Sequence, residues 1–147
     1  MIADSINRLR YLCDTIPESL RSISEAAYTA KPVPNKSSKK EILGHLIDSA
    51  TNNHQRFVRV QFEENPAIWY DQDRWVIYSA HQQTDVEQLI TFWESYNRHL
   101  TFLLGQLPEE RLGRPCRMKD GRTVTLVFLI NDYVSHLEHH LKQLIDY

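Results

Sequence analysis

Residues 125–145 read TLVFLINDYVSHLEHHLKQLI, and this stretch decides the fold class. A helix turns once every 3.6 residues, so apolar side chains at alternating steps of four and three residues form one stripe along it. The segment therefore predicts an amphipathic α-helix whose stripe packs against other helices. The stripe consists of Ile130, Val134, Leu137, Leu141 and Leu144.

Three earlier segments show the same repeat and predict helices over 2–15, 37–63 and 84–107. We expect Pro17 to end the first helix, because a proline inside a helix removes one backbone hydrogen bond. The other two helices begin with residues that favour helix N-termini. The candidate N-caps are Ser37 or Ser38 for the second helix and Thr84, in a capping box with Glu87, for the third.

Two long links connect the last three helices. Residues 67–82 are rich in aromatic side chains, so we expect them to pack over the bundle. Residues 109–124 contain Asp120-Gly121, a pair typical of hairpin turns. The links predict long crossover connections in place of a simple up-down-up-down order.

Composition supports an all-α, four-helix bundle that occupies residues 1–147 as a single domain. The sequence has only 4 Gly and 6 Pro in 147 residues, too few for the many turns of a β-sandwich or barrel. It also contains no glycine-rich phosphate loop, which argues against nucleotide-binding folds of that kind. The 7 histidines are unusually many, and they need an explanation.

Charge and hydropathy exclude several classes of partner. The 17 basic and 19 acidic residues give a net charge of −2, so we expect no nucleic-acid partner. No apolar run is long enough to span a bilayer, and residues 1–20 do not resemble a signal peptide. Cys13 and Cys116 form no disulfide pattern, so we expect a reducing cytoplasmic location with no membrane association, and an exposed, inert thiol at Cys116.

The predicted last helix contains the first candidate metal ligands. His136 and His140 are four residues apart, so their imidazoles lie on one side of the helix, one turn apart. Two histidines at this spacing can bind one metal ion, as they do in helical zinc sites. They fall at the edge of the apolar stripe, near Leu129 and Tyr133, whereas His139 should face solvent.

Spacing does not decide which histidine completes the site. A catalytic metal centre commonly has three protein ligands and an open position. On the second helix, His45 shares a face with Ser49, Asn52 and Arg56, whereas His54 lies on the apolar side. Periodicity leaves both open, and seven histidines also produce such spacings by chance. His81 and His99 are expected to be bystanders, and Asp48 and Asp132 are candidates to hold a ligand histidine by a hydrogen bond.

Three segments resemble the DinB-like superfamily, also known as the DinB/YfiT-like metalloenzymes. They are KEILGHLIDS at 40–49, NNHQRF at 52–57 and DYVSHLEHHLKQLI at 132–145. The order of the helices and the lengths of the links also agree with that family. Its members often have Trp-Ser just before the second helix, where this sequence has Ser37-Ser38, so packing should differ there.

The resemblance implies a divalent metal ion held by His45, His136 and His140. Nickel or zinc is expected, although three imidazoles suit several metals. His54, Asp48, Asp132 and Tyr133 are then candidates for the surrounding pocket. The resemblance further implies a homodimer and a small-molecule substrate, in some members a low-molecular-weight thiol.

These features predict a metal-dependent enzyme, either a thiol S-transferase or a hydrolase, in which a water or thiol at the metal is the nucleophile. The aromatic segment 69–78 would close the pocket, and the basic segment 114–122 would contact an anionic group of a thiol cosubstrate. The alternative is a metal-binding or stress-response bundle without catalysis. A third interpretation is a structural bundle in which the histidines have no role.

Overall fold

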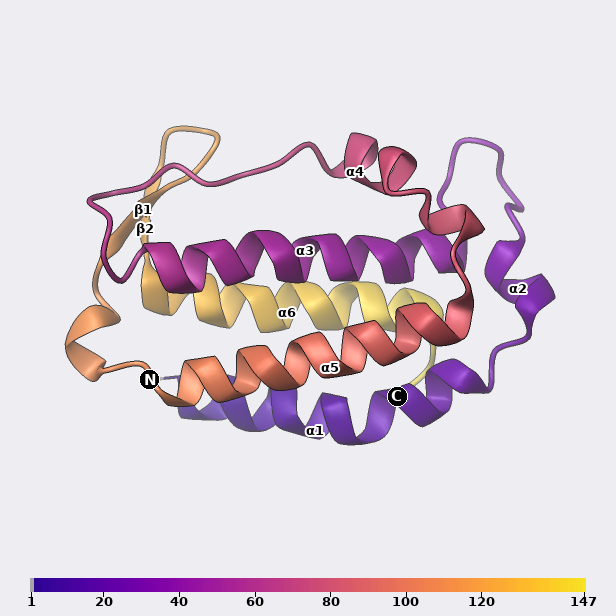
Figure 1. The fold of residues 1–147 in the computed structure, drawn as a ribbon, viewed down its shortest axis with the longest axis horizontal. Helices are drawn as coiled ribbons and strands as arrows, with labels where there is room; N and C mark the ends of the chain where they lie inside the picture. Colours follow the sequence, from indigo (N-terminus) through magenta and orange to yellow (C-terminus); the bar gives the residue numbers. More distant parts are fainter. Residues whose placement is uncertain (1) are drawn as a thin grey trace.

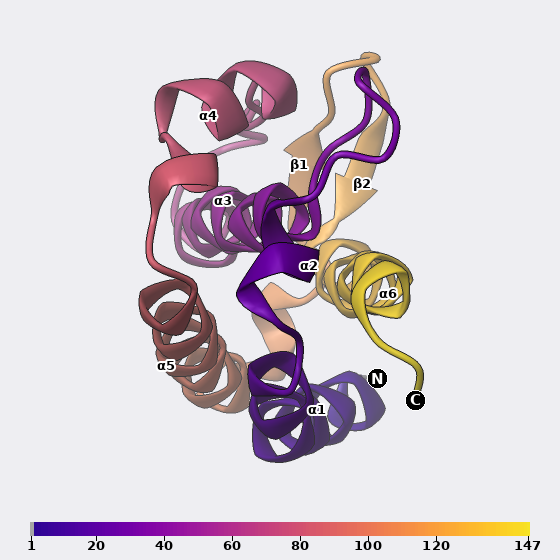
Figure 2. The same cartoon turned by 90° about the vertical axis from the view of Figure 1, so that its right-hand side faces the viewer.

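Four long helices lie side by side in the computed structural model, which describes residues 2–147 (Figure 1). Viewed end-on they form a square, in which α5 and α6 each contact both α1 and α3 (Figure 2). The predicted all-α, four-helix bundle is confirmed. None of the described helices is long and apolar enough to cross a membrane. The four helices are α1 (Ala3–Arg21), α3 (Lys39–Arg59), α5 (Val86–Gly105) and α6 (Leu126–Leu144).

The helices do not alternate in direction, because residues 60–85 cross back along the length of the bundle. This crossover runs over the outer side of α3, so α3 and α5 are parallel, whereas α3 and α6 are antiparallel (Figure 1). It contains the short helix α4 (Gln72–Tyr78) and a single 3-10 turn, η1 (His81–Gln83). The predicted long crossover is therefore present. The other links contain α2 (Glu25–Thr29) and the turn η2 (Glu109–Arg111).

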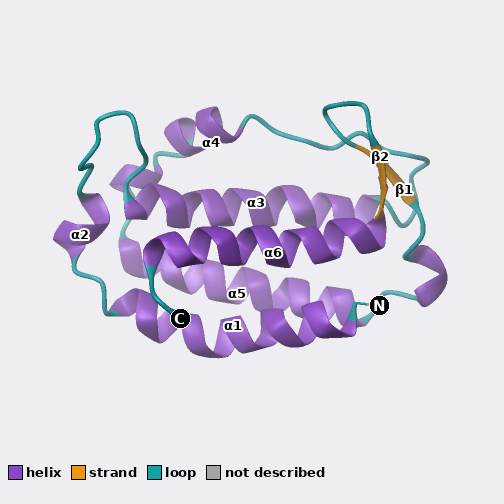
Figure 3. Ribbon diagram, turned by 180° about the vertical axis from the view of Figure 1, so that it is seen from behind, coloured by secondary structure: helices purple, strands orange, loops and turns teal. Residues whose placement is uncertain are grey.

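A small β-hairpin precedes α6 and contains the two β-strands of the described residues (Figure 3). Its antiparallel strands are β1 (Pro115–Arg117) and β2 (Thr123–Thr125). Gly121 has a φ of 89° in the connecting turn, a conformation that favours glycine, as the Asp-Gly pair predicts. The expected exposed thiol at Cys116 is wrong, because the thiol is buried and donates to the Pro66 carbonyl at 3.2 Å. Burial raises the pKa of Cys116.

The core between the helices is apolar, with a few polar groups that are hydrogen-bonded. Trp93 of α5 and Phe57 of α3 are fully buried within it. The Tyr133 hydroxyl donates to the Asn97 side chain at 2.6 Å, and the Asn97 amide donates to the Trp93 carbonyl. These bonds satisfy the side chains of Tyr133 and Asn97, whereas the indole Nε1 of Trp93 is buried without a partner among the described residues.

Helix α1 does not end before Pro17, contrary to the sequence-based prediction, and continues to Arg21. Pro17 has no N–H to donate to the Cys13 carbonyl one turn earlier. Arg98 of α5 replaces this donor, since its Nη2 lies 3.1 Å from the Cys13 oxygen. A guanidinium from a neighbouring helix thus allows the helix to pass through the proline.

The N-terminus of α3 confirms one predicted cap, and that of α5 corrects another. Ser38 caps α3, and its side chain forms a capping box with Glu41. The predicted Thr84–Glu87 box is wrong, because Asp85 caps α5 through the Gln88 N–H. The Glu87 carboxylate instead pairs with Arg21 on α1. Helix α3 also ends earlier than predicted, at Arg59, and a turn follows it.

Arg98→Met is expected to lower the free energy of unfolding by about 1–2 kcal/mol, because the Cys13 carbonyl loses its donor. The cost should be smaller in a Pro17→Ala background, where the alanine N–H can bond to that carbonyl. Urea denaturation of the four proteins gives the coupling. Arg10→Met is the control, since Arg10 is exposed and bonds locally to Asn7. Equal costs of Arg98→Met in both backgrounds would contradict the explanation.

Candidate metal centre

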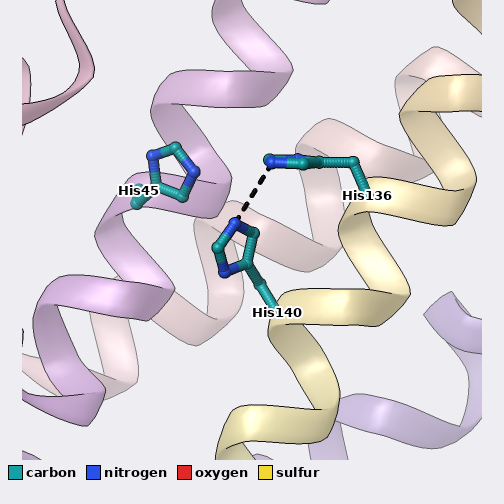
Figure 4. Close-up of side chains that lie close together, drawn as sticks. All are labelled: His45, His136 and His140. Carbon is teal, nitrogen blue, oxygen red and sulfur yellow. Dashed lines mark hydrogen bonds between the residues drawn. The ribbon is translucent and has the colours of Figure 1, made fainter.

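Helices α3 and α6 bring three histidines together (Figure 4). His45 comes from α3, and His136 and His140 come from adjacent turns of α6. One ring nitrogen from each lies within 4.8 Å of the others. The Nε2 atoms of His136 and His140 are 3.2 Å apart. The antiparallel packing of α3 on α6 therefore builds a cluster of three imidazoles from residues about 90 positions apart in the sequence.

His45 is held in the neutral form that binds metal ions. Burial, together with the neighbouring His140 and His136, lowers its pKa to about 4. Its Nε2 is buried and has no hydrogen-bond partner, whereas its Nδ1 lies 3.4 Å from the Tyr70 hydroxyl. Burial also lowers the pKa of His136, with a contribution from His140. Protons therefore compete weakly with a metal ion at neutral pH.

The donor set fits a divalent cation. The Gln143 side-chain oxygen lies 2.9 Å from His140 Nδ1, so it can accept that N–H and leave Nε2 free as a ligand. Tetrahedral zinc binds histidine nitrogens at about 2.0–2.1 Å, which spaces neighbouring nitrogens by about 3.3 Å. The His136–His140 separation is close to this value. Three imidazoles leave a coordination position open, but they do not select one metal.

Two cavities adjoin the cluster from different sides. One of about 470 Å³ touches His45 and His140, and it is lined also by Ile42 and Val76. The other, of about 510 Å³, touches His136 and is more polar. Residues 72–73 at the start of α4 line both. The centre is therefore accessible to small molecules from two directions.

The remaining predicted pocket residues have different roles. His54 faces α5, where its Nδ1 lies 2.9 Å from the Tyr96 hydroxyl, and it is not part of the cluster. Tyr133 is buried and bonded to Asn97, with its ring at the edge of the polar cavity. Asp132 is exposed and lines the same cavity. The geometry thus groups His45, and not His54, with the two histidines of α6.

His81 lies outside the histidine cluster, as expected, but it has a structural role that the sequence did not indicate. It is buried, and its Nε2 lies 2.9 Å from an Asp48 carboxylate oxygen. Asp48 was a candidate to hold a ligand histidine. It bonds to His81 instead and so anchors the crossover to α3. The His81 ring lies against Gly44, where an added Cβ would overlap the ring. A glycine inside a helix was the available signal of this close approach.

Tyr70 contacts His45 and was not singled out in the sequence. It belongs to the aromatic segment that was expected to cover the bundle, and that segment does run beside α3. The segment nevertheless leaves Ile77 and Tyr78 largely exposed. Residue periodicity does not show which residues of the crossover lie beside which residues of α3. The contact between Tyr70 and His45 could therefore be identified only from the structure.

Comparison with known proteins identifies the class. Residues 8–144 match the DinB superfamily, so the chain belongs to this family. The chain is 25% identical over 132 residues to "Putative metal-dependent hydrolase BH0277" of Halalkalibacterium halodurans, covering 86% of this chain and 77% of that protein. It is 27% identical over 109 residues to "Putative metal-dependent hydrolase YfiT" of Bacillus subtilis, covering 73% of this chain but 61% of the relative.

Solved structures confirm the fold. YfiT from Bacillus subtilis, described as a probable metal-dependent hydrolase with an unusual four-helix bundle topology, superposes with a TM-score of 0.85 at 22% identity, covering 94% of this chain and 80% of that one. A mycothiol-dependent maleylpyruvate isomerase superposes with a TM-score of 0.77 at 12% identity. That match covers 96% of this chain and 59% of the isomerase.

We predict that His45→Ala and His136→Ala each reduce bound divalent metal from about one ion per chain to a trace, because two imidazoles hold a cation weakly. Elemental analysis of purified protein measures this. His139→Ala is the matched control, since this exposed residue lies on the same helix beside His140. Unchanged metal content in His136→Ala would place the ion elsewhere.

Gly44→Ala is expected to destabilise the protein by about 1–2 kcal/mol. Alanine favours a helix interior over glycine by about 1 kcal/mol, but the displaced His81–Asp48 bond costs more. Thermal and urea unfolding measure the difference. Gly105→Ala is the control, because an added Cβ there meets no atom. If the two variants were equally stable, His81 would not depend on Gly44.

Proposed function

We propose that the protein is a divalent-metal-dependent enzyme acting on a small molecule, with the metal held by His45, His136 and His140. The observation that supports this most strongly is the buried Nε2 of His45, which has no partner and faces the two other imidazoles. A buried polar atom without a hydrogen bond is costly unless a ligand satisfies it. A bound cation, nickel or zinc, would lower the pKa of a water or thiol so that it acts as a nucleophile.

The side chains around the cluster would orient the ligands. The Tyr70 hydroxyl lies beside His45 Nδ1, and the Gln143 oxygen accepts from His140 Nδ1. Both contacts favour rings whose Nε2 atoms point into the cluster. Burial keeps His45 neutral.

Hydrolysis and thiol transfer are the two reaction classes that we consider. The names of the two relatives support a hydrolase, which needs one organic substrate and water. The two cavities beside the cluster favour an S-transferase, since one could hold a thiol and the other an electrophile. A metal-binding bundle without turnover is the competing explanation.

The experiment loads metal-free protein with nickel, zinc, cobalt or manganese and measures two activities. Hydrolysis is followed with p-nitrophenyl acetate, and thiol transfer with monochlorobimane and glutathione, bacillithiol or mycothiol. We expect one activity to depend on the metal, to be lost in His136→Ala and to be retained in His139→Ala. Metal binding without turnover in either assay would favour the non-catalytic bundle.

A further inference from the structure

A polar stripe continues from His45 along α3. It consists of Ser49, Asn52 and Arg56, which follow His45 at steps of four, three and four residues and therefore lie on one face. All three line the cavity of about 510 Å³ that touches His136. Eleven residues of helix span about 16 Å, so the stripe leads well away from the histidines. Nothing in the metal chemistry requires polar residues at these positions.

Asn52 shows that the stripe is built for a ligand. Its side chain is on a residue only 7% exposed, and its amide makes no hydrogen bond with any of the described residues 2–147. Its neighbour Asn53, by contrast, donates to the Ser49 carbonyl at 2.8 Å. The amide atoms of Asn52 are not fully enclosed, since among the described residues the buried side-chain atoms without a partner are His45 Nε2 and Trp93 Nε1. The amide therefore keeps its donors and its acceptor for a ligand in the cavity that it lines.

Arg56 adds a positive charge that is not in a close ion pair, although the nearby Asp132 carboxylate partly offsets the effect of burial on its pKa. Its Nε and Nη2 donate to the Ile68 carbonyl at 3.0 and 2.7 Å, and it forms no ion pair with a carboxylate of the described residues. A guanidinium has five N–H donors, so some stay available to a ligand. Burial lowers the pKa of Arg56, which indicates that its charge is poorly solvated. An anion next to it would be stabilised for the same reason.

The other charged residues of the cavity allow an anion at this end. Lys119, in the turn of the hairpin, lines the same cavity as Arg56. Asp71 caps α4 and pairs with Arg74, so its charge is partly neutralised. Asp73 and Asp132 are exposed to solvent, which screens them.

We propose that this cavity binds the substrate, and that Asn52, Arg56 and Lys119 hold a carboxylate or phosphate group of it while its reacting end lies at the three histidines. The substrate class is thus an elongated, polar, anionic molecule. This proposal rests on the proposed metal-dependent function for the reacting end, but the anion site itself needs no metal. If Arg56 served only to anchor the Ile68 carbonyl, its two hydrogen bonds there would be explained. The absence of a partner for the Asn52 amide would not be.

The test is an NMR titration of the protein with inorganic phosphate and with acetate, against chloride at equal ionic strength. We expect saturable chemical-shift changes of the Asn52 side-chain amide and the Arg56 Nε–H with either anion. Comparison of the two affinities shows whether the site prefers phosphate or carboxylate. Shifts that are identical in chloride, or that lie away from both side chains, would overturn the proposal.

Asn52→Leu separates binding from structure. Replacing an amide that bonds to no other side chain by an apolar one should not lower the melting temperature, whereas anion affinity should fall at least tenfold. A purely structural Asn52 would lower the melting temperature and leave anion binding unchanged, which would overturn its assignment. Arg56→Lys keeps the charge and should retain part of the affinity, whereas Arg56→Met should abolish it. Arg10→Met, which removes one exposed charge on α1, is the control.

Repeating the titration with metal-free protein and with His136→Ala distinguishes the two proposals. Anion binding that persists without a metal-dependent activity would contradict the proposed function and support the anion site. Metal-dependent activity in a protein that shows no shifts at Asn52 and Arg56 would support the proposed function and contradict the anion site.

Discussion

The antiparallel contact between α3 and α6 is the interaction on which the rest of this molecule depends. It buries apolar stripes of both helices, and at one end of this contact it encloses three imidazoles instead of leucines. Burying His45 costs stability unless its ring is neutral, and its pKa of about 4 shows that the packing enforces this. The same contact that stabilises the bundle thus prepares a ligand set for a cation.

The crossover of residues 60–85 couples the fold to the site. It is held to α3 near one end by Arg56, which bonds the Ile68 carbonyl, and near the other by the buried His81–Asp48 pair. Between these anchors lie Tyr70, which contacts His45, and α4, which borders both cavities. A segment that a simple bundle would not need therefore forms the outer wall of the centre.

Most polar groups inside the bundle are hydrogen-bonded, whereas one nitrogen at the histidine cluster is not. Tyr133 and Asn97 bond to each other inside the core, and Arg98 supplies the donor that Pro17 lacks. Among the described residues, His45 Nε2 at the centre and Trp93 Nε1 in the core are buried without a partner. Asn52, on the same face of α3 as His45, is mostly buried and lines the polar cavity. A buried histidine nitrogen without a partner, next to two cavities, is typical of a site that keeps its bonding capacity for ligands at some cost in stability.

Helical periodicity alone determined the four helices, the long crossovers and the pairing of His136 with His140, because a period of 3.6 residues is a local property of the sequence. It could not choose between His45 and His54, since that choice depends on how α3 is rotated against α6, and only resemblance to a family favoured His45. The continuation of α1 through Pro17, the burial of Cys116 and the His81–Asp48 pair were decided by contacts between segments distant in the sequence. A donor from Arg98 and a carbonyl from Pro66 become available only once the helices have packed. The glycine at position 44 signals a close approach, but it does not identify His81 as the partner.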